Sequence, residues 1–301
     1  MKIASFKAGQ TATYGLVTNA GVIDAGKRLK AYPSLKALLA QGSLDALKAL
    51  QTERPDYALA EIELLPTVPD PDKIFCIGVN YATHLAESGH PTPPHPMIFT
   101  RFANSQVGGG QPMIRPLESE RFDFEGEMAV IIGKAGRRIA RETALSHVAG
   151  YACYNDGSIR DWQRHTSQFA PGKNFVGTGA FGPWMVTTDE IPDISKQTIA
   201  TRLNGVEVQA APISDLVFDV PALIAYCSTF TELVIFTSNV ATDTRLYSMA
   251  QNPAYRNHMT IKGYLQSPLP DYYMGSDMDM PPRPNIRHPG SGAIPAESAI
   301  L

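Results

Sequence analysis

The sequence predicts an α+β protein in which strands dominate the larger, second part of the chain. Short apolar runs separated by Gly, Pro and polar clusters are typical of strands. Such runs fall at 74–79, 97–102, 128–133, 148–155 and 184–187. Helical signals are few and fall at 81–88, 140–148 and 220–231. Strands and helices do not alternate in a βαβ pattern, so a Rossmann sheet is not expected.

The first 66 residues predict a small N-terminal α+β domain. Residues 2–6, 13–17 and 22–23 have the character of short strands. Residues 34–50 carry six leucines, and Gly42-Ser43 is expected to break them into two short helices. Three prolines within 66–71 exclude a helix and disfavour a central strand. We therefore place a linker there, between a first domain at 1–66 and a second at 72–233.

Composition and charge narrow the class of protein. The 301 residues carry a formal net charge of −3, so electrostatics favours neither nucleic acid nor an anionic membrane as a partner. The first residues lack the apolar core of a signal peptide, and no apolar run reaches the roughly 18–20 residues that span a bilayer. Cys76, Cys153 and Cys227 have neither disulfide density nor metal-ligand spacing. We expect a soluble protein of a reducing compartment, the cytoplasm by default.

The segment 122–133 is the most informative part of the chain. Asp123, Glu125 and Glu127 alternate with other residues and lead into a Val-Ile-Ile run. In one continuous strand, side chains two residues apart share a face, so the three carboxylates should lie together about 7 Å apart. No basic residue stands in register to neutralise them, and such an oxygen cluster suits Mg²⁺, Mn²⁺ or Ca²⁺. A solvated strand face is the alternative.

Two further charged residues could complete an acidic site. Asp156 ends an apolar strand, from which its carboxylate can point into a cleft, although an ordinary Asn-Asp-Gly turn is the alternative. Lys173 lies in the Gly-rich stretch 169–184, which lacks both the Walker and the G-x-G-x-x-G spacing. Beside several acids its ammonium group would hold an anion or stabilise developing negative charge. A solvated loop lysine is the plainer reading.

His84 and Glu87 form a candidate catalytic pair. If 81–88 is helical, the two side chains are three residues apart and share a face. A carboxylate that orients an imidazole makes it a better general base toward water. The spacing is common, so a pair without function on an exposed helix is the alternative. The other histidines form no zinc-binding pattern, and no G-x-S-x-G elbow supports a serine hydrolase.

Taken in order, these motifs resemble the fumarylacetoacetate hydrolase family. The resemblance runs from about residue 72 to 233, a little over half of the chain. Its motifs, in the family's order and spacing, are 73–81 with His84 and Glu87, 122–133, 155–163, Gly172-Lys173, 182–184, 202–205 and 214–221. The resemblance implies a β-rich roll preceded by a small N-terminal domain, usually paired as a homodimer.

The resemblance also implies a metal site. By position, Glu125, Glu127 and Asp156 would bind Mg²⁺ or Mn²⁺, with Ca²⁺ as a further candidate. Asp123 then takes a supporting role on the same face. A metal held by three carboxylates keeps open positions that can chelate a 2-oxo acid through its carboxylate and keto oxygens.

The same resemblance implies catalytic roles. His84 and Glu87 would activate water on a segment that closes as a lid, and Lys173 would stabilise an enolate or oxyanion. The residues implied to bind substrate are Tyr81, Arg160 and Gln163. The expected substrate is a small anionic 2-oxo acid.

Our leading hypothesis from sequence is a metal-dependent hydrolase of aromatic catabolism that cleaves a C–C bond. Its substrate would be a 2,4-dioxo acid of the acylpyruvate, fumarylpyruvate or fumarylacetoacetate type. On the same site, relatives isomerise or decarboxylate 2-hydroxy-diene dioates or cleave ureidoglycolate, so these reactions stay open. A hypothesis of a different class is a non-catalytic remnant that still binds metal.

The end of the chain departs from the family pattern. Members normally continue beyond the helix near Leu233 with a Pro-Gly-Asp turn and a Thr-Gly-Thr-Pro-x-Gly-Val-Gly substrate loop, and neither occurs in 234–301. We expect a shifted reading frame or a replaced C-terminus, with a loosely ordered tail as a further option. Translating the coding DNA in the other two frames beyond Leu233 tests the first of these.

Overall fold

The computed structural model describes residues 1–88, 91–233, 236–240 and 261–266, and the side chains of Glu87 and Ser88 and of the last two segments lie outside this description. A 12-stranded sheet forms the frame of the molecule. A two-stranded and a three-stranded sheet stand beside it. The predicted α+β class with strands in the majority is confirmed.

The large sheet follows one long path with three strands attached to its side. Along the path the strands are β3 (Gly21–Asp24), β2 (Thr11–Thr18), β1 (Lys2–Ala8), β13 (Met185–Thr187), β10 (Val148–Asn155), β9 (Gly126–Ile132), β16 (Phe236–Val240), β5 (Lys73–Gly78) and β6 (Met97–Arg101). The attached strands are β4 (Ile62–Leu64), β7 (Gln106–Gly108) and β12 (Gly179–Phe181). The small sheets are β8 (Phe122–Asp123) with β11 (Ser158–Ile159), and β15 (Val206–Pro212), β14 (Thr198–Leu203) and β17 (Ile261–Gln266).

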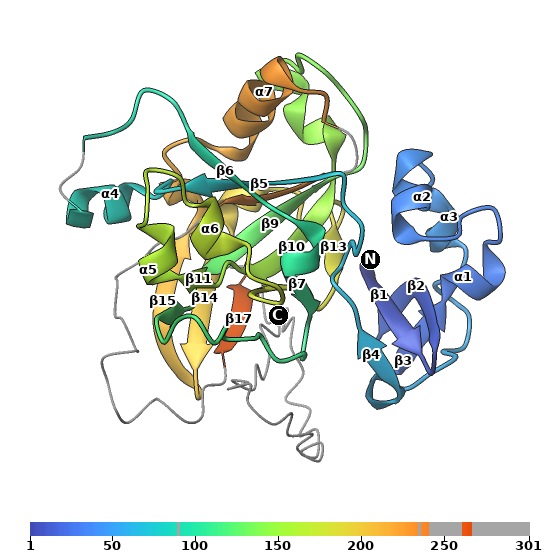
Figure 1. Cartoon of the computed structure of the whole chain (residues 1–301). Coiled ribbons are helices and arrows are strands. Elements are labelled where there is room, and N and C mark those ends of the chain that lie inside the picture. Colours follow the sequence, from blue (N-terminus) through green and yellow to red (C-terminus); the bar gives the residue numbers. More distant parts are fainter. Residues whose placement is uncertain (89–90, 234–235, 241–260, 267–301) are drawn as a thin grey trace.

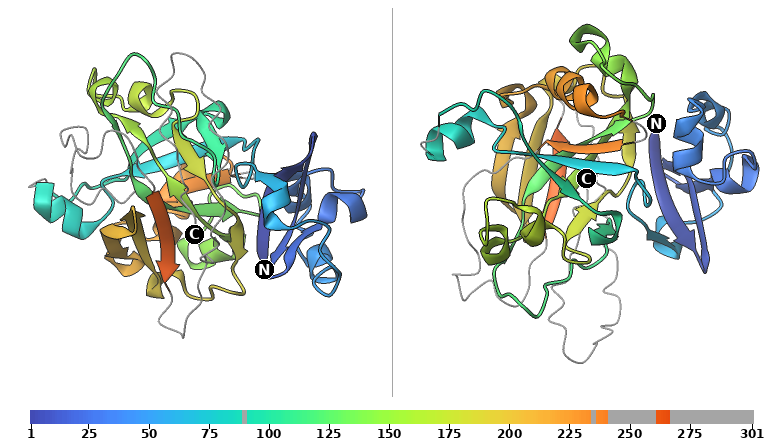
Figure 2. Two further views of the ribbon diagram at one scale, coloured as in Figure 1. Left: turned by 90° about the horizontal axis from the view of Figure 1, so that it is seen from below. Right: turned by 45° about the horizontal axis from the view of Figure 1, so that its top comes forward.

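Helices are short and lie around the sheets (Figures 1 and 2). The α-helices are α1 (Ala25–Arg28), α2 (Leu35–Ala40), α3 (Asp45–Lys48), α4 (Ala82–Ser88), α5 (Arg160–Gln163), α6 (Ala170–Lys173) and α7 (Val220–Phe230). Single 3₁₀ segments are Leu59–Glu61, Ala103–Ser105, Arg141–His147, Ile194–Lys196 and Ile213–Asp215. None of the helices in the described part of the chain is long and apolar enough to cross a membrane.

The N-terminal module, drawn in blue, lies at one side of the molecule in Figures 1 and 2. Its three strands and its two helices broken near Gly42 confirm the elements predicted there. The module is tied to the rest of the chain, because Lys2 and Ile3 of β1 pair with Val186 and Met185 of β13. The sheet is thus continuous across the expected linker, and the domain limits remain a prediction.

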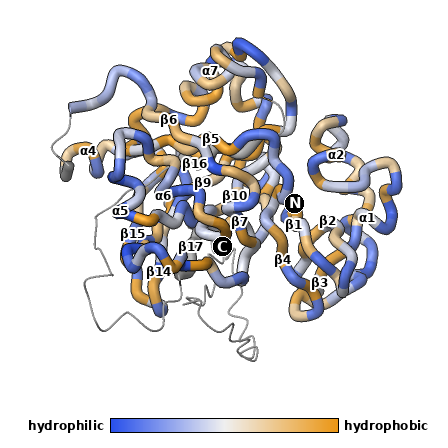
Figure 3. Tube along the Cα trace, in the orientation of Figure 1, coloured by the Kyte–Doolittle hydropathy of each residue, from blue (hydrophilic) through white to orange (hydrophobic). Residues whose placement is uncertain are grey.

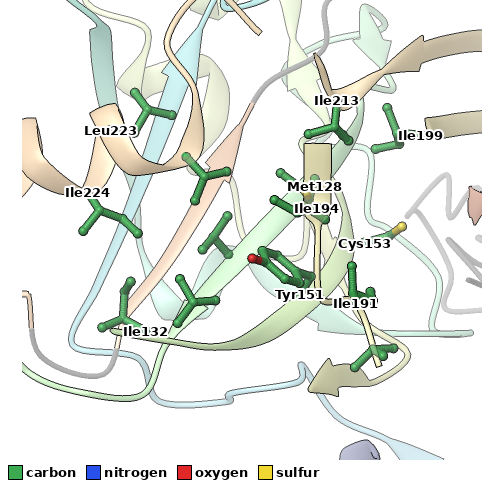
Figure 4. Packing of buried hydrophobic residues seen from close by; sticks show 14 of the residues in the cluster. Met128, Ile132, Tyr151, Cys153, Ile191, Ile194, Ile199, Ile213, Leu223 and Ile224 are labelled. Carbon is green, nitrogen blue, oxygen red and sulfur yellow. The ribbon is translucent and has the colours of Figure 1, made fainter. Parts of the chain in front are cut away.

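The core has two parts, one on each face of β9. Met128, Val130 and Ile132 face a cluster that includes the apolar side of α7 and is drawn in Figure 4. Ala129 and Ile131 face a second cluster, which β9 shares with the leucines of α2 and α3. Because both faces are covered, every residue of β9 is buried, and the strand is apolar except for Glu127. Figure 3 shows the apolar stretches along β5 and β6, which follow β9 and β16 in the sheet.

One predicted helix takes a different form. Residues 140–148 were expected to be α-helical, but Arg141–His147 form 3₁₀ turns. Ser228 of α7 holds the backbone N–H groups of Arg138 and Ile139, and β10 begins at Val148. The seven residues Arg141–His147 therefore have to lead the chain from this contact with α7 into the central strand β10, which 3₁₀ geometry allows.

The expectations for the end of the chain fall mostly outside the described residues. Two strands of this segment are described. β16 lies between β5, to which it is parallel, and β9, to which it is antiparallel. β17 pairs with β14. Residues 234–235, 241–260 and 267–301, on which the expectations of a shifted frame and a loose tail depend, lie outside the description.

Candidate functional site

The acidic segment is split between two sheets. We expected one continuous strand through Asp123, Glu125 and Glu127, and this is wrong, because β8 ends at Asp123 and β9 begins at Gly126. Backbone pairing explains the break. Asp123 pairs with Ser158 in the small sheet, whereas Glu125 donates its N–H to the side chain of Asn155 and accepts from the N–H of Asp156. The carboxylates of Asp123 and Glu125 nevertheless contact the same cationic side chain.

Arg160 is that cation. Its guanidinium lies 2.8 Å from the carboxylate of Asp123 and 2.6 Å from Glu125 Oε1. Arg160 Nη1 also donates to the side chain of Gln163, so these two predicted substrate-binding residues stand together. The expectation that no basic residue neutralises the acids is wrong. Arg160 comes from the start of α5, and only the pairing of β8 with β11 brings it to the acids.

Lys173 is the centre of the site. Its Nζ lies 2.7 Å from Glu125 Oε2 and 2.7 Å from Asp156 Oδ2, and the side chain is 1% exposed. Lys173 is the last residue of α6, which starts with a proline in its first turn. Gly172 permits the close approach of α6 to α5, since a Cβ there would meet the backbone of Gln163 at 2.4 Å. The lysine is thus no solvated loop residue.

Arg101 is a member of the site that the sequence reasoning missed. Its Nη1 lies 2.6 Å from Asp156 Oδ1, and both side chains are fully buried. Burial of the strand did not signal it, because Met97–Thr100 are exposed or half-buried and only Arg101 of β6 is buried. A buried arginine needs a partner, and the 55 residues that separate Arg101 from Asp156 hide that partner from sequence patterns.

The site therefore balances three carboxylates with three cations. The acids are Asp123, Glu125 and Asp156, and the cations are Arg101, Arg160 and Lys173. Ser158 adds a hydrogen bond of 2.7 Å to Glu125 Oε1. Buried charges persist in proteins when they are paired in this way.

Burial and pairing act in opposite directions on the pKa values of the site. Burial alone raises the pKa of Glu125, but the charges of Lys173 and Arg160 outweigh it and lower the pKa to about 2. Burial lowers the pKa of Lys173, but Asp156 and Glu125 outweigh it, so the pKa ends above the usual 10.5. For Asp123, burial dominates over Arg160 and raises the pKa. Lys173 is therefore an ammonium group at neutral pH.

The lowered pKa of Glu125 predicts an acid-sensitive contribution to stability in the metal-free protein. A carboxylate whose pKa falls on folding stabilises the protein above its unfolded pKa of 4.5, and this contribution is lost as the pH falls toward about 2. Between about pH 5 and about pH 2.5, the free energy of unfolding should therefore fall by about 2–3 kcal/mol less in Glu125→Gln than in wild type. Urea unfolding measures this free energy at each pH. Glu142→Gln, at an exposed carboxylate, is the control. Parallel losses in wild type and Glu125→Gln would contradict the pairing.

The helix α4 carries the predicted His84 and Glu87. Asp215 accepts hydrogen bonds from the N–H and the hydroxyl of Thr83, which anchors the start of the helix. His84 is 8% exposed, and only the backbone of Glu87 is described. The geometry of the predicted pair thus lies outside the described residues.

Tyr81 and Glu127 connect the start of α4 to the acid strand. Tyr81 lies in the apolar core, and burial together with the charge of Glu127 raises the pKa of its hydroxyl. Glu127 is fully buried on β9. Among the residues that the structure describes, no three His, Cys, Asp or Glu side chains are grouped closely enough to hold a metal ion. Glu125 and Asp156, however, meet at one point, which Lys173 Nζ occupies.

The β-rich fold and the buried carboxylate–lysine site lie in a part of the chain that matches a known family. Residues 73–237 match the family described as fumarylacetoacetate (FAA) hydrolase, C-terminal, and the match spans more than half of the chain. The chain therefore belongs to the fumarylacetoacetate hydrolase family, and the predicted resemblance is confirmed.

Proteins similar to the chain include a tautomerase and a hydrolase. The chain is 40% identical over 190 residues to the mitochondrial oxaloacetate tautomerase fahd2 of Xenopus laevis. The matched residues make up 62% of this chain and 60% of that protein. The chain thus spans about 60% of the length of the curated relatives it matches. Fumarylacetoacetate hydrolase from psychrophilic Exiguobacterium antarcticum is similar in structure, with 26% identity, a TM-score of 0.73 and coverage of 88% of this chain and 95% of that chain.

A third similar structure shares the fold at lower identity. Maleylpyruvate hydrolase from Sphingobium sp. SYK-6, in complex with manganese(II) ion and pyruvate, has 23% identity and a TM-score of 0.67. The match covers 88% of this chain and 95% of that chain. This likeness concerns the fold alone, and the specific reaction of this chain is a separate question.

Proposed function

We propose that this chain catalyses keto–enol tautomerisation of a small 2-oxo dicarboxylic acid of the oxaloacetate type, with a divalent cation at its carboxylates. The observation that carries the proposal is the ammonium group of Lys173, buried 2.7 Å from both Glu125 and Asp156. Tautomerisation passes through an enolate, and a fixed, desolvated cation is a strong stabiliser of such an oxyanion. The 40% identity to an oxaloacetate tautomerase supports the same reaction.

The donor chemistry of the site fits a hard divalent cation such as Mg²⁺ or Mn²⁺. Glu125, Glu127 and Asp156 would hold it, since all three are buried and offer carboxylate oxygens only. Glu125 and Asp156 already bring one oxygen each to a single cationic atom, so Glu127 is the ligand that remains to be brought in. When bound, the cation polarises the 2-oxo carbonyl group. The manganese complex of the maleylpyruvate hydrolase supports this choice of ion.

Two side chains are assigned to the enolate: Lys173 stabilises it, and His84 moves the proton. Lys173 is protonated because its pKa is raised, so it donates a hydrogen bond to the enolate oxygen and does not act as a base. His84 takes the proton from the carbon beside the carbonyl group and delivers it to the oxygen, and the reverse sequence regenerates the keto form. Arg160 and Gln163 would bind the second carboxylate of the substrate, since they stand together at Glu125.

Hydrolysis of a C–C bond in a 2,4-dioxo acid is the second candidate. It is favoured by His84, since a nearly buried imidazole on α4 could activate a water molecule. This reaction needs the same enolate stabilisation by Lys173 and, in addition, a water held by His84 and Glu87. Assembly as a homodimer and a cytoplasmic location accompany either function as proposals.

A direct assay separates the two candidates. The purified protein with Mn²⁺ is given enol-oxaloacetate, whose absorbance falls on ketonisation, and in parallel an acylpyruvate, whose cleavage releases pyruvate. We expect accelerated decay of the enol and no pyruvate. Release of pyruvate at a higher kcat/KM than enol decay would replace the tautomerase by the hydrolase. Activity on neither substrate, with Mn²⁺ bound, would favour the non-catalytic remnant.

Replacement of His84 tests the proton transfer. We expect His84→Gln to lower kcat for enol decay about 10²–10⁴-fold, the usual contribution of a general acid–base group. His147→Gln serves as the control, because His147 bonds to the backbone of Lys134 and lies away from the cluster. Enol decay that is unchanged in His84→Gln would remove His84 from the mechanism.

A further inference from the structure

Five groups, one of them the carboxylate of Asp156, surround the buried guanidinium of Arg101. Its Nε donates to Ser105 Oγ at 3.3 Å, its Nη1 to the backbone oxygen of Gly157 at 3.0 Å, and its Nη2 to Thr178 Oγ1 at 2.9 Å. The guanidinium also lies 5.8 Å from the ring of Tyr154, and its bond to Asp156 Oδ1 completes the set. The donors of the guanidinium are thus directed to fixed acceptors, which a planar fork allows and an ammonium group does not.

A second set of contacts fixes the groups that surround Arg101. The hydroxyl of Tyr154 donates to Gln106 Oε1, and Gln106 Nε2 donates to Ser105 Oγ at 2.6 Å. Gly179 leaves the required space, because a Cβ there would meet Tyr154 Oη at 2.4 Å and Arg101 Nη2 at 2.8 Å. A side chain held on every side in this way has one orientation.

The two oxygens of Asp156 have different partners. Oδ1 faces Arg101 and Oδ2 faces Lys173, each from a different direction of the carboxylate. Because Oδ1 is held at 2.6 Å by a guanidinium that is itself fixed, the carboxylate has little freedom to rotate. Oδ2 is therefore the oxygen presented to the site.

We propose that Arg101 is a positioning residue that holds Asp156 by Oδ1, so that Oδ2 alone is offered to a divalent cation. The inference rests on the proposed function, in which Asp156 is a ligand. Arg101 acts through Asp156 and touches neither the cation nor the substrate.

Binding of Mn²⁺ to the full chain tests the role without an activity readout. The affinity and the electron paramagnetic resonance signal of bound Mn²⁺ are measured for wild type and Arg101→Lys, with circular dichroism as a check on folding. We expect Arg101→Lys to raise Kd about 10–100-fold, as is typical when a group that orients a ligand is replaced. Arg141→Lys is the matched control, since Arg141 also lies 2.6 Å from an acid, Asp219, but at the surface. It should change Kd by no more than about twofold.

Every outcome decides between the alternatives. A wild-type Kd in Arg101→Lys overturns the inference and leaves the proposed function intact. If Arg101→Lys does not fold, Thr178→Val decides, because it removes the anchor of Nη2 and the hydroxyl's bond to the backbone oxygen of Phe175 but leaves every charge in place. Thr178→Val should raise Kd about fivefold, the worth of one hydrogen bond, and an unchanged Kd overturns the inference. Absence of Mn²⁺ binding in wild type refutes the metal site of the proposed function and the inference with it.

Discussion

Replacement of Lys173 with methionine is expected to lower kcat about 10²–10³-fold, the cost of removing one donor from an oxyanion site. Methionine keeps an unbranched chain of similar length but has no charge, so the enolate oxygen loses its hydrogen bond. The pKa of Lys173 is raised, and the wild-type side chain is therefore charged over the whole range in which the assay is made. Steady-state kinetics with enol-oxaloacetate and Mn²⁺ measures the effect.

The control for this variant is Lys196→Met. Lys196 also pairs with an acid, Asp193, at 3.2 Å, but its side chain is 70% exposed. An exposed pair contributes about 0–1 kcal/mol, so neither kcat nor stability should change appreciably. If Lys173→Met retains wild-type kcat, the enolate is stabilised elsewhere and the proposal loses the observation that carries it.

Replacement of Asp156 with asparagine should destabilise the metal-free protein strongly. Asparagine preserves the shape of the side chain but leaves the fully buried Arg101 without its anionic partner. Removal of one partner from a buried ion pair costs about 3–5 kcal/mol, because the remaining charge stays desolvated. Lys173 loses one of its two carboxylates in the same step. Urea unfolding at neutral pH measures the loss.

Asp219→Asn is the matched control for this experiment. Asp219 lies 2.6 Å from Arg141, the same separation as in the buried pair, but both side chains are about half exposed. Asparagine can still cap α7, as Asp219 does by accepting from the N–H of Ala222. We expect a loss of about 0–1 kcal/mol. Equal losses in the two variants would show that burial does not set the energetics of the site.

Local patterns were sufficient for much of the framework. The short strand-like runs of β1 and β2, the leucine spacing of α2 and the Asp219–Pro221 start of α7 are signals carried by neighbouring residues. Side-chain periodicity and capping act over a few residues, so they can be read without knowledge of the fold. The 3₁₀ form of Arg141–His147 could not be read in this way, because Ser228 of another helix imposes it.

The chemistry of the site divides in the same manner. Glu125, Asp156 and Lys173 were recognised as a group from residue types and motif order, and in the structure each carboxylate lies 2.7 Å from Lys173 Nζ. Their neutralisation was not recognised. Lys173 and Glu125 are 48 residues apart, and Arg101 and Asp156 are 55 residues apart. Such pairs depend on how separate sheets and helices pack, which no local pattern reports.

The sequence alone therefore established the family, the β-rich class and the grouping of Glu125, Asp156 and Lys173, since these depend on composition, local periodicity and motif order. Tertiary structure alone decided that the acidic segment is divided between β8 and β9, and that three cations face three carboxylates. The physical reason is desolvation. Once packing removes these acids from water, each must meet a cation, and the cation that meets it is the one that strand pairing delivers.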